Sequence, residues 1–234
     1  MKKLNVLLAT VAAFGLAACG GDKSQDASSA SASAPKSITM NLAHNQNETH
    51  PVHLAIEMFA KEVADKTQGR IQIKVYPNAQ LGSETECLEQ LNTGVLPMTK
   101  VSAPGLASFD DAYNTFGLPY LFKDTKDFYR VMDSKQMQDF IPDALVMSSK
   151  VWNTLSKEDQ NVILTAARNS TEWQKQAWDK ATDEAIKEAK EKMGVEFVTD
   201  VDKAAFQSAT SGMVDQYSNE YPGVKKLVEL IKSI

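Results

Sequence analysis

The chain has few cysteines and lacks the short motifs that mark common enzymes. Only Cys19 and Cys87 occur among its 234 residues, too few for a disulfide framework or a cysteine-based metal cluster. It contains no Gly-x-Gly-x-x-Gly or Gly-Lys-Ser/Thr phosphate loop, no Gly-x-Ser-x-Gly elbow and no His-Glu-x-x-His helix. Cys87, Ser102 and the acidic residues also lack the spacing of a nucleophile and its base. We therefore expect neither an enzyme nor a bound nucleotide cofactor.

An excess of basic residues is missing as well. The chain has 25 Lys and Arg against 30 Asp and Glu, which gives a net charge of −5. Nucleic acid is an improbable partner for such a surface. No apolar run after residue 18 approaches the 18 or more residues that a membrane-spanning helix requires.

The N-terminal residues carry the pattern of an export signal. Lys2 and Lys3 precede an apolar run that ends in small residues at Cys19, as in bacterial lipoprotein signals. We predict a signal peptide at 1–18 and lipidation of Cys19; an ordinary signal peptide, with Cys19 incidental, is the alternative. Residues 19–36 have almost no large apolar side chain and are typical of a flexible linker. The protein is then periplasmic or in the cell envelope, held to the membrane only by lipid.

Strand and helix patterns alternate after this linker. Residues 38–43 and 71–76 alternate in polarity, as half-buried strands do. Between them, Pro51 begins a helix that ends near Gly69. A second helix is predicted at about 83–93, followed by an apolar strand-like run at 95–98. The side chains expected on the buried face of the first helix are Leu54, Met58, Phe59 and Val63.

This order of elements predicts an α/β fold with a parallel sheet. Ligands of such sheets bind outside the carboxyl ends of the strands. In this chain those ends lead into residues 44–47, 78–84 and 100–104. We expect the binding site there.

Several motifs occur together in a recognisable order. They are Glu57-Met58-Phe59-Ala60, Thr67-Gln68-Gly69-Arg70-Ile71-Gln72-Ile73, Val75-Tyr76-Pro77-Asn78-Ala79-Gln80-Leu81-Gly82 and Leu118-Pro119-Tyr120-Leu121-Phe122. In this order they resemble the DctP-type solute-binding proteins of TRAP transporters. Residues 143–148 and 156–160 resemble the late strand and the start of the long helix of that family. The resemblance covers essentially residues 37–234.

The resemblance implies a receptor outside the cytoplasm, not an enzyme. Members of the family capture a small organic acid, such as a C4-dicarboxylate, between two lobes and deliver it to the TRAP membrane permease. By position, Asn45, Glu84 and Ser102 resemble residues that line the family's ligand cleft. His44 and Lys100 join them on chemical grounds, because a carboxylate requires N–H donors and positive charge in a site that excludes water.

The chain departs from the family near Ile141. A predicted helix at 125–140 runs directly into the late strand, where the family has a large central block. That block includes the arginine that usually binds the ligand carboxylate with two hydrogen bonds, worth on the order of 1.5 to 3 kcal/mol. Arg70, Arg130 and Arg168 are the arginines of this chain, and none replaces it by position. We therefore expect an internal deletion and poor carboxylate binding.

The C-terminal third is predicted to be mostly helical. Ser156 and Asp159 resemble a capping box, and the helix that they begin can extend to Met193, before Gly194. Burial of Trp173 and Trp178 along its apolar stripe is the favoured interpretation, and an aromatic ligand platform is the alternative. A strand at 195–198 and helices at 202–217 and 224–231 follow, all expected to pack.

A metal site is the competing hypothesis for function. His44, His50 and His53 lie within ten residues, and with Glu48 they could bind zinc in a lipoprotein outside the cytoplasm. Each histidine also has a simple structural explanation at a strand end or helix start, so the organic-acid receptor is preferred.

These observations together predict an α/β protein of the periplasmic-binding-protein type. It would have two lobes, a parallel or mixed sheet in lobe I, a long C-terminal helix and an incomplete lobe II. The predicted divisions are a signal peptide at 1–18, a lipidated cysteine and linker at 19–36, lobe I at 37–140, and a remnant of lobe II with the C-terminal helices at 141–234.

Overall fold

A computed structural model of the protein describes residues 36–137, 140 and 143–234. The chain divides into one unit of residues 1–34 and another of residues 35–234, and the described residues belong to the second. The predicted signal peptide, the lipidation site at Cys19 and all but the last residue of the predicted linker lie outside the described residues. Within the described ranges, no helix combines the length and apolar character needed to cross a bilayer.

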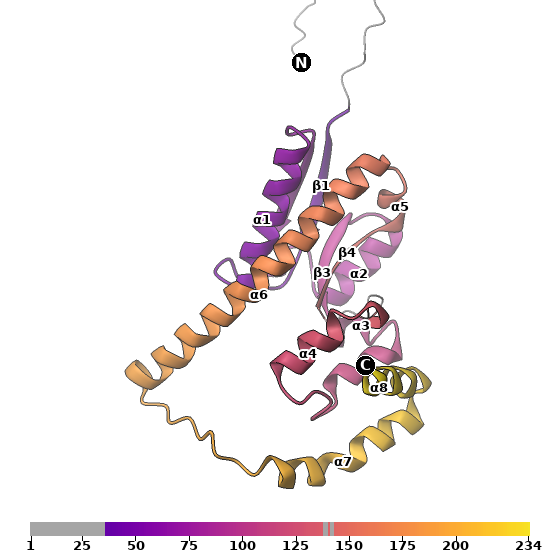
Figure 1. Cartoon of the computed structure of the whole chain (residues 1–234). Coiled ribbons are helices and arrows are strands. Elements are labelled where there is room, and N and C mark those ends of the chain that lie inside the picture. Colours follow the sequence, from indigo (N-terminus) through magenta and orange to yellow (C-terminus); the bar gives the residue numbers. More distant parts are fainter. Residues whose placement is uncertain (1–35, 138–139, 141–142) are drawn as a thin grey trace, which may run out of the picture. The chain divides into compact units, whose positions relative to one another are not determined.

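A four-stranded mixed sheet forms the centre of the second unit (Figure 1). Its strands lie in the order β2-β1-β3-β4, with β1 paired in parallel to β2 and β3. Strand β4 pairs with β3 in the antiparallel direction, which places Met147 opposite Met98 and Asp143 opposite Ser102. The strands are β1 (Ile38–Ala43), β2 (Ile71–Tyr76), β3 (Met98–Ser102) and β4 (Asp143–Met147).

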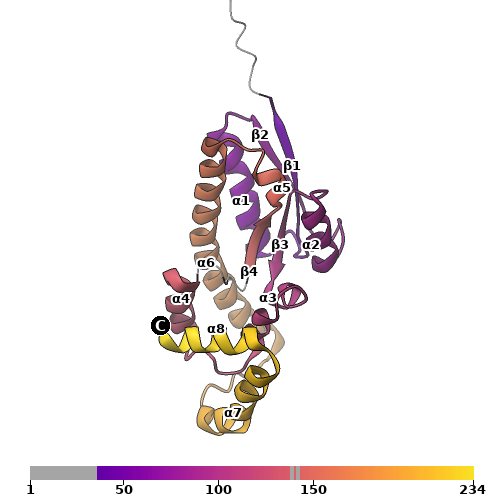
Figure 2. The same ribbon diagram turned by 90° about the vertical axis from the view of Figure 1, so that its right-hand side faces the viewer.

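Helices cover both faces of this sheet (Figure 2). Helices α1 (Pro51–Lys66) and α6 (Lys157–Met193) pack on one face, and α2 (Glu84–Thr93) lies on the other. Helix α5 (Ser149–Trp152) leads from β4 into α6. Burial of this apolar surface is the main source of stability. The core between the sheet, α1 and α6 contains Met40, Leu42, Val52, Ile56, Phe59, Val63, Ile71, Met98, Leu155, Ile163 and Ala166.

The predicted ends of these helices are confirmed by their caps. The ring of His50 accepts a hydrogen bond from the Val52 N–H at the start of α1. Ser83 and Glu86 form a reciprocal capping box on α2, which ends at Gly94 with a φ of 84°. The Ser156 hydroxyl accepts from the Asp159 N–H at the start of α6.

An ion pair fastens the beginning of α6 to the turn before β2. Arg70 donates to both carboxylate oxygens of Asp159, whose side chain is 6% exposed. The hydrogen bond from Arg70 holds the pKa of the Asp159 carboxyl below its usual value. This bidentate contact joins segments that are 89 residues apart.

A second, smaller core lies among the helices that follow β3. Helix α8 packs on η1, with Ala112, Val131, Met137, Leu227 and Ile231 buried between α8, η1, α4 and η2. A Cβ at Gly223 would collide with Asp111 and come within 2.8 Å of the Ala112 backbone nitrogen, so α8 approaches η1 closely because this residue is glycine. The elements of this region are α3 (Ala103–Leu106), η1 (Asp111–Gly117), α4 (Thr125–Met132), η2 (Lys135–Met137), α7 (Lys203–Glu220) and α8 (Pro222–Ser233).

Five predictions about these elements are wrong in detail. Leu54 is 45% exposed, because α1 turns Val52, Ala55 and Ile56 toward the core instead. The third strand begins at Met98, after Pro97, which has no N–H to donate. The helix predicted at 125–140 ends at Met132. Of the residues described between there and 140, only Lys135–Met137 are helical, as a short 3-10 turn.

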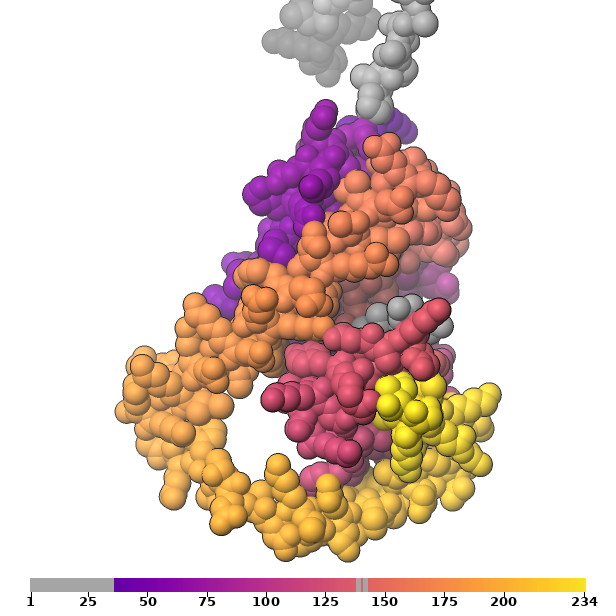
Figure 3. Space-filling model, viewed as in Figure 1, coloured from indigo at the N-terminus to yellow at the C-terminus, as the bar shows by residue number. Residues whose placement is uncertain are grey.

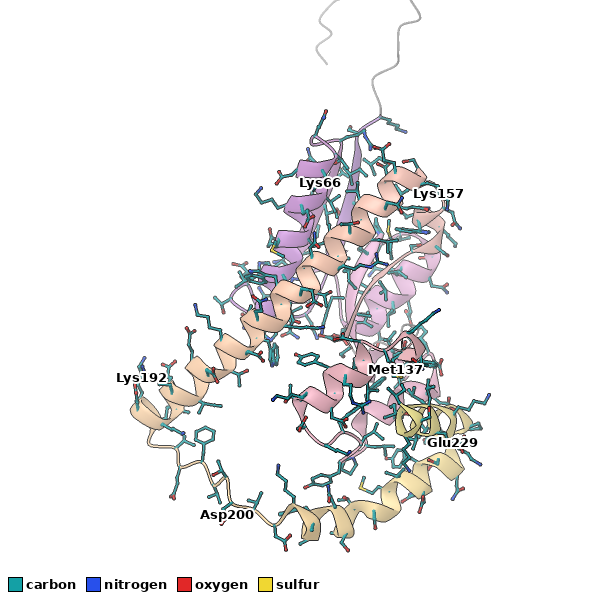
Figure 4. The ribbon with its side chains drawn as sticks, in the orientation of Figure 1. Lys66, Met137, Lys157, Lys192, Asp200 and Glu229 are labelled. Carbon is teal, nitrogen blue, oxygen red and sulfur yellow. The ribbon has the colours of Figure 1, made fainter. Side chains whose placement is uncertain are left out.

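The last two errors concern the last third of the chain. Residues 195–198 form no strand, and no described strand lies beside them to supply hydrogen bonds. All residues of α6 after Ser170 are described, and none of them is buried. Trp173 and Trp178 are 38% and 43% exposed, so their predicted burial is wrong. Figure 3 shows the surface of this half of α6, and Figure 4 marks it by Lys192, far along the helix from Lys157.

Candidate functional site

The candidate site lies at one edge of the sheet. The carboxyl ends of the parallel strands β1, β2 and β3 meet there. Because β4 is antiparallel, its first residue, Asp143, reaches this same edge and lies opposite Ser102. The first turn of α2 brings Glu84 to Ser102, and α1 brings His53 to His44.

Lys100 is the buried cation of this edge. Its side chain is 7% exposed, and its Nζ lies 2.6 Å from Asp143 Oδ1 and 3.7 Å from Glu84 Oε1. The Asp143 side chain is 47% exposed, whereas that of Glu84 is 12% exposed. With both acids ionised, the three side chains carry one net negative charge. Lys100 therefore already has an anionic partner within the protein.

Glu84 is held in place by Ser102. The Ser102 hydroxyl donates to Glu84 Oε2 at 2.6 Å, and the Ser102 backbone N–H donates to the same oxygen at 3.2 Å. The neighbouring Gly105 leaves room for this carboxylate, since a Cβ there would lie 2.7 Å from Oε2. The other oxygen, Oε1, is buried, and no described residue donates a hydrogen bond to it. It is an acceptor that a ligand hydroxyl could satisfy.

The hydrogen bonds of His44 define its tautomer. The Gln46 backbone N–H donates to His44 Nδ1 at 3.1 Å, so the ring proton lies on Nε2. That nitrogen is 3.0 Å from His53 Nδ1 and donates to it. His44 is 3% exposed, and its burial, together with nearby His53 and Lys100, lowers the pKa of its imidazole to about 4. His44 is neutral at pH 7.

This geometry does not favour the zinc hypothesis. His44 and His53 form a hydrogen bond with each other, and His50 Nδ1 caps the N-terminus of α1. Among the described residues, no group of three or more His, Cys, Asp or Glu side chains is arranged to hold a metal ion.

The structure gathers four of the five predicted site residues. His44, Glu84, Lys100 and Ser102 lie at the same sheet edge, whereas Asn45 is exposed and its side-chain oxygen accepts from Gln46. The three arginines lie elsewhere: Arg70 and Arg130 pair with Asp159 and Asp127, and Arg168 is an exposed residue of α6.

Sequence reasoning missed Asp143, which the antiparallel pairing of β4 brings to Lys100. A lone aspartate at the start of a strand gives no signal of this role.

Two hollows adjoin this edge. One of about 130 Å³ lies between α1, β4 and α6, with Lys100, Asp143, Ser170 and Gln174 among its lining residues. The other, of about 460 Å³, is mostly apolar and is lined by His50, Trp178, Ile186 and Phe197 among others. His50 and Trp178 lie edge to face with ring centroids 5.4 Å apart. Trp178 thus lines a hollow instead of filling a core.

The family model DctP, described as bacterial extracellular solute-binding protein, family 7, matches residues 42–143 and 139–220. The two matched segments meet around Ile141, where the sequence predicts the loss of a central block. The YiiZ protein of Salmonella typhimurium is 39% identical over 100 residues, which are 43% of this chain and 30% of YiiZ. The match thus spans about a third of that relative's length.

Solved structures of the same fold are also similar to the described unit. A TRAP periplasmic solute-binding protein from Anaerococcus prevotii, with bound d-glucuronate, has a TM-score of 0.74 at 20% identity, covering 84% of this chain and 97% of that one. The sugar acid binding protein DctPAm from Advenella mimigardefordensis, in complex with galactonate, has a TM-score of 0.76 at 16% identity, covering 85% and 99%. These similarities confirm the predicted α/β fold of the periplasmic-binding-protein type. On the family match, this chain belongs to the bacterial extracellular solute-binding proteins of family 7.

Proposed function

We propose that this chain binds a small organic acid of the sugar-acid class outside the cytoplasm and presents it to a TRAP membrane permease. The observation that carries the proposal is the cluster of Lys100, Glu84 and Ser102 at the carboxyl edge of the sheet in a chain of this family. Related structures hold d-glucuronate and galactonate. Lipid anchoring through Cys19 in the cell envelope is part of the same proposal.

The cluster offers each group of a sugar acid a partner. The Lys100 ammonium can pair with the ligand carboxylate. Glu84 Oε1 is buried and receives no hydrogen bond within the part of the chain that the structure describes, so it can accept one from a ligand hydroxyl. A dicarboxylate without hydroxyls could not make this hydrogen bond, which to a charged acceptor is worth about 1.5 to 3 kcal/mol. This difference favours a hydroxylated acid over a simple dicarboxylate.

We expect the affinity to be low. None of the three arginines reaches the sheet edge, so the two-pronged arginine contact of the family is not available here. Losing such a contact weakens binding about ten- to a hundredfold. A dissociation constant below a millimolar, measured by calorimetry, would contradict this expectation.

Thermal unfolding of the purified protein against d-glucuronate, galactonate, succinate and d-glucose tests the proposal. A ligand at 100 times its dissociation constant adds ~2.7 kcal/mol, which raises the midpoint by about 5 to 10 °C. We expect a shift with a sugar acid and none with d-glucose, which lacks the carboxylate. Lys100→Met and Glu84→Gln should abolish the shift, and the distant charge variant Asp65→Asn should retain it. Equal shifts with d-glucose and d-glucuronate, or no shift with any acid, would refute the proposal.

A further inference from the structure

The contact between Lys100 and Asp143 has the geometry of a bound carboxylate. The 2.6 Å separation of Nζ and Oδ1 is that of a short charge-assisted hydrogen bond. Among the described residues, Lys100 is the only cation within ion-pair distance of Asp143. The Lys100 ammonium is almost fully buried, so a ligand carboxylate reaching it must take the place that Asp143 holds.

The two acids beside Lys100 differ in how firmly they are held. Glu84 accepts two hydrogen bonds from Ser102 and lies 3.7 Å from Nζ. Asp143 is closer to Nζ, yet its side chain is 47% exposed. The half-exposed carboxylate of Asp143 can rotate into solvent without being desolvated. Moving Glu84 would break its two hydrogen bonds from Ser102. Asp143 is therefore the acid that can yield.

There is also space beside the contact. The hollow of about 130 Å³ is lined by both Lys100 and Asp143, with the polar side chains of Ser170, Thr171 and Gln174 on the α6 side. The Ser170 and Thr171 hydroxyls donate to the Ala167 carbonyl, whereas the Gln174 side-chain amide can donate to a carboxylate that displaces Asp143.

We propose that Asp143 acts as an internal competitor, its carboxylate occupying the Lys100 ammonium that the ligand carboxylate requires. The inference rests on the proposed function for the identity of the ligand. Its test with acetate does not depend on that identity. Asp143 lies next to the join near Ile141, so the shortened chain carries a substitute anion at its own binding site. Ligand binding then requires exchange of one carboxylate for another, and removing the internal one should strengthen binding.

The test compares the purified protein with Asp143→Asn and Asp143→Ser. Asp65→Asn is the control, because it removes the same charge from an exposed pair with Lys61 on α1. Two probes are used: acetate, the smallest carboxylate, followed through the NMR signal of the Lys100 side chain, and d-glucuronate, followed by calorimetry. Thermal unfolding verifies that each variant is folded, and the serine variant serves if the asparagine variant is not.

We expect both Asp143 variants to bind acetate about 10- to 100-fold more tightly than the parent, and Asp65→Asn to match the parent. Adding Lys100→Met should remove the gain. Tighter acetate binding without any d-glucuronate binding would support the internal competitor while refuting the sugar-acid function. Equal d-glucuronate affinity in the parent and the Asp143 variants would be consistent with the sugar-acid function but would refute the role of Asp143 as a competitor. Unchanged acetate affinity in a folded variant would also overturn it.

Discussion

Acidification should destabilise this protein through His44. The native state holds the imidazole neutral with a pKa of about 4, whereas in the unfolded chain its pKa has the ordinary histidine value of 6.5. A group whose pKa is lowered on folding contributes stability that is complete above the unfolded pKa and is lost as pH falls toward the folded one. The loss therefore falls between pH 6.5 and pH 4. Its physical origin is the cost of charging a ring that is 3% exposed and lies near Lys100.

The size of the effect follows from the two pKa values. Each pKa unit corresponds to about 1.4 kcal/mol, so lowering the pH from 7.5 to 4.5 should cost about 2.5 kcal/mol through this residue. Urea unfolding at the two pH values measures the change. Other groups titrate over the same interval, so the informative quantity is the difference between the parent and His44→Gln. Glutamine cannot be protonated, and it retains an N–H that can donate to His53.

His44→Gln will lower stability at pH 7.5, because it alters packing and the bond to Gln46. Its loss on acidification should nevertheless be smaller than that of the parent by about 2.5 kcal/mol. An NMR titration of the ring gives a second reading, with no protonation of His44 expected until the pH nears 4. An imidazole that titrates near 6.5 in the folded protein, or equal acid sensitivity in parent and variant, would refute the reasoning.

Two further predictions concern packing between distant segments. Asp159→Asn should lower the free energy of unfolding by about 2 kcal/mol, because Arg70 loses a bidentate partner. The control Asp65→Asn, in an exposed ion pair, should lower it by less than about 0.5 kcal/mol. Equal losses of the two variants in urea unfolding would contradict the importance of burial. Gly223→Ala should cost about 1 to 3 kcal/mol, because its Cβ meets the backbone of η1. Gly212→Ala in α7 meets nothing within 4 Å and should be neutral or slightly stabilising, so a similar loss in both variants would show that the close approach of α8 is unimportant.

Much of the sheet and its helices could be predicted because their signals are local. Alternating polarity identified β1 and β2, and Pro51, Gly94 and Ser156 mark helix ends through backbone chemistry that does not depend on distant residues. The rule that ligands bind at the carboxyl ends of parallel strands selected the sheet edge at which His44, Glu84, Lys100 and Ser102 meet.

Predictions failed where an element needs a neighbouring element to pack or pair with, because the local sequence pattern does not show whether that neighbour is present. The apolar stripe of α6 shows which face would be buried, but Trp173 and Trp178 stay exposed because none of the described elements covers them. Residues 195–198 alternate as a strand does, but a strand forms only beside another strand. Lys100 was predicted to lie in a loop, yet it lies inside β3. Its ammonium forms ion pairs with Glu84 of α2 and Asp143 of β4.

The division between sequence and tertiary structure follows from the range of the interactions. By itself, the amino-acid sequence determined the α/β class, the family and the sheet edge at which the candidate site lies, since periodicity, caps and motif order are properties of neighbouring residues. Only the tertiary structure decided that Asp143 neutralises Lys100 and that His44 is kept neutral. Both depend on the register of β4 against β3 and on the burial of ionisable groups, which arise when segments far apart in the chain come into contact.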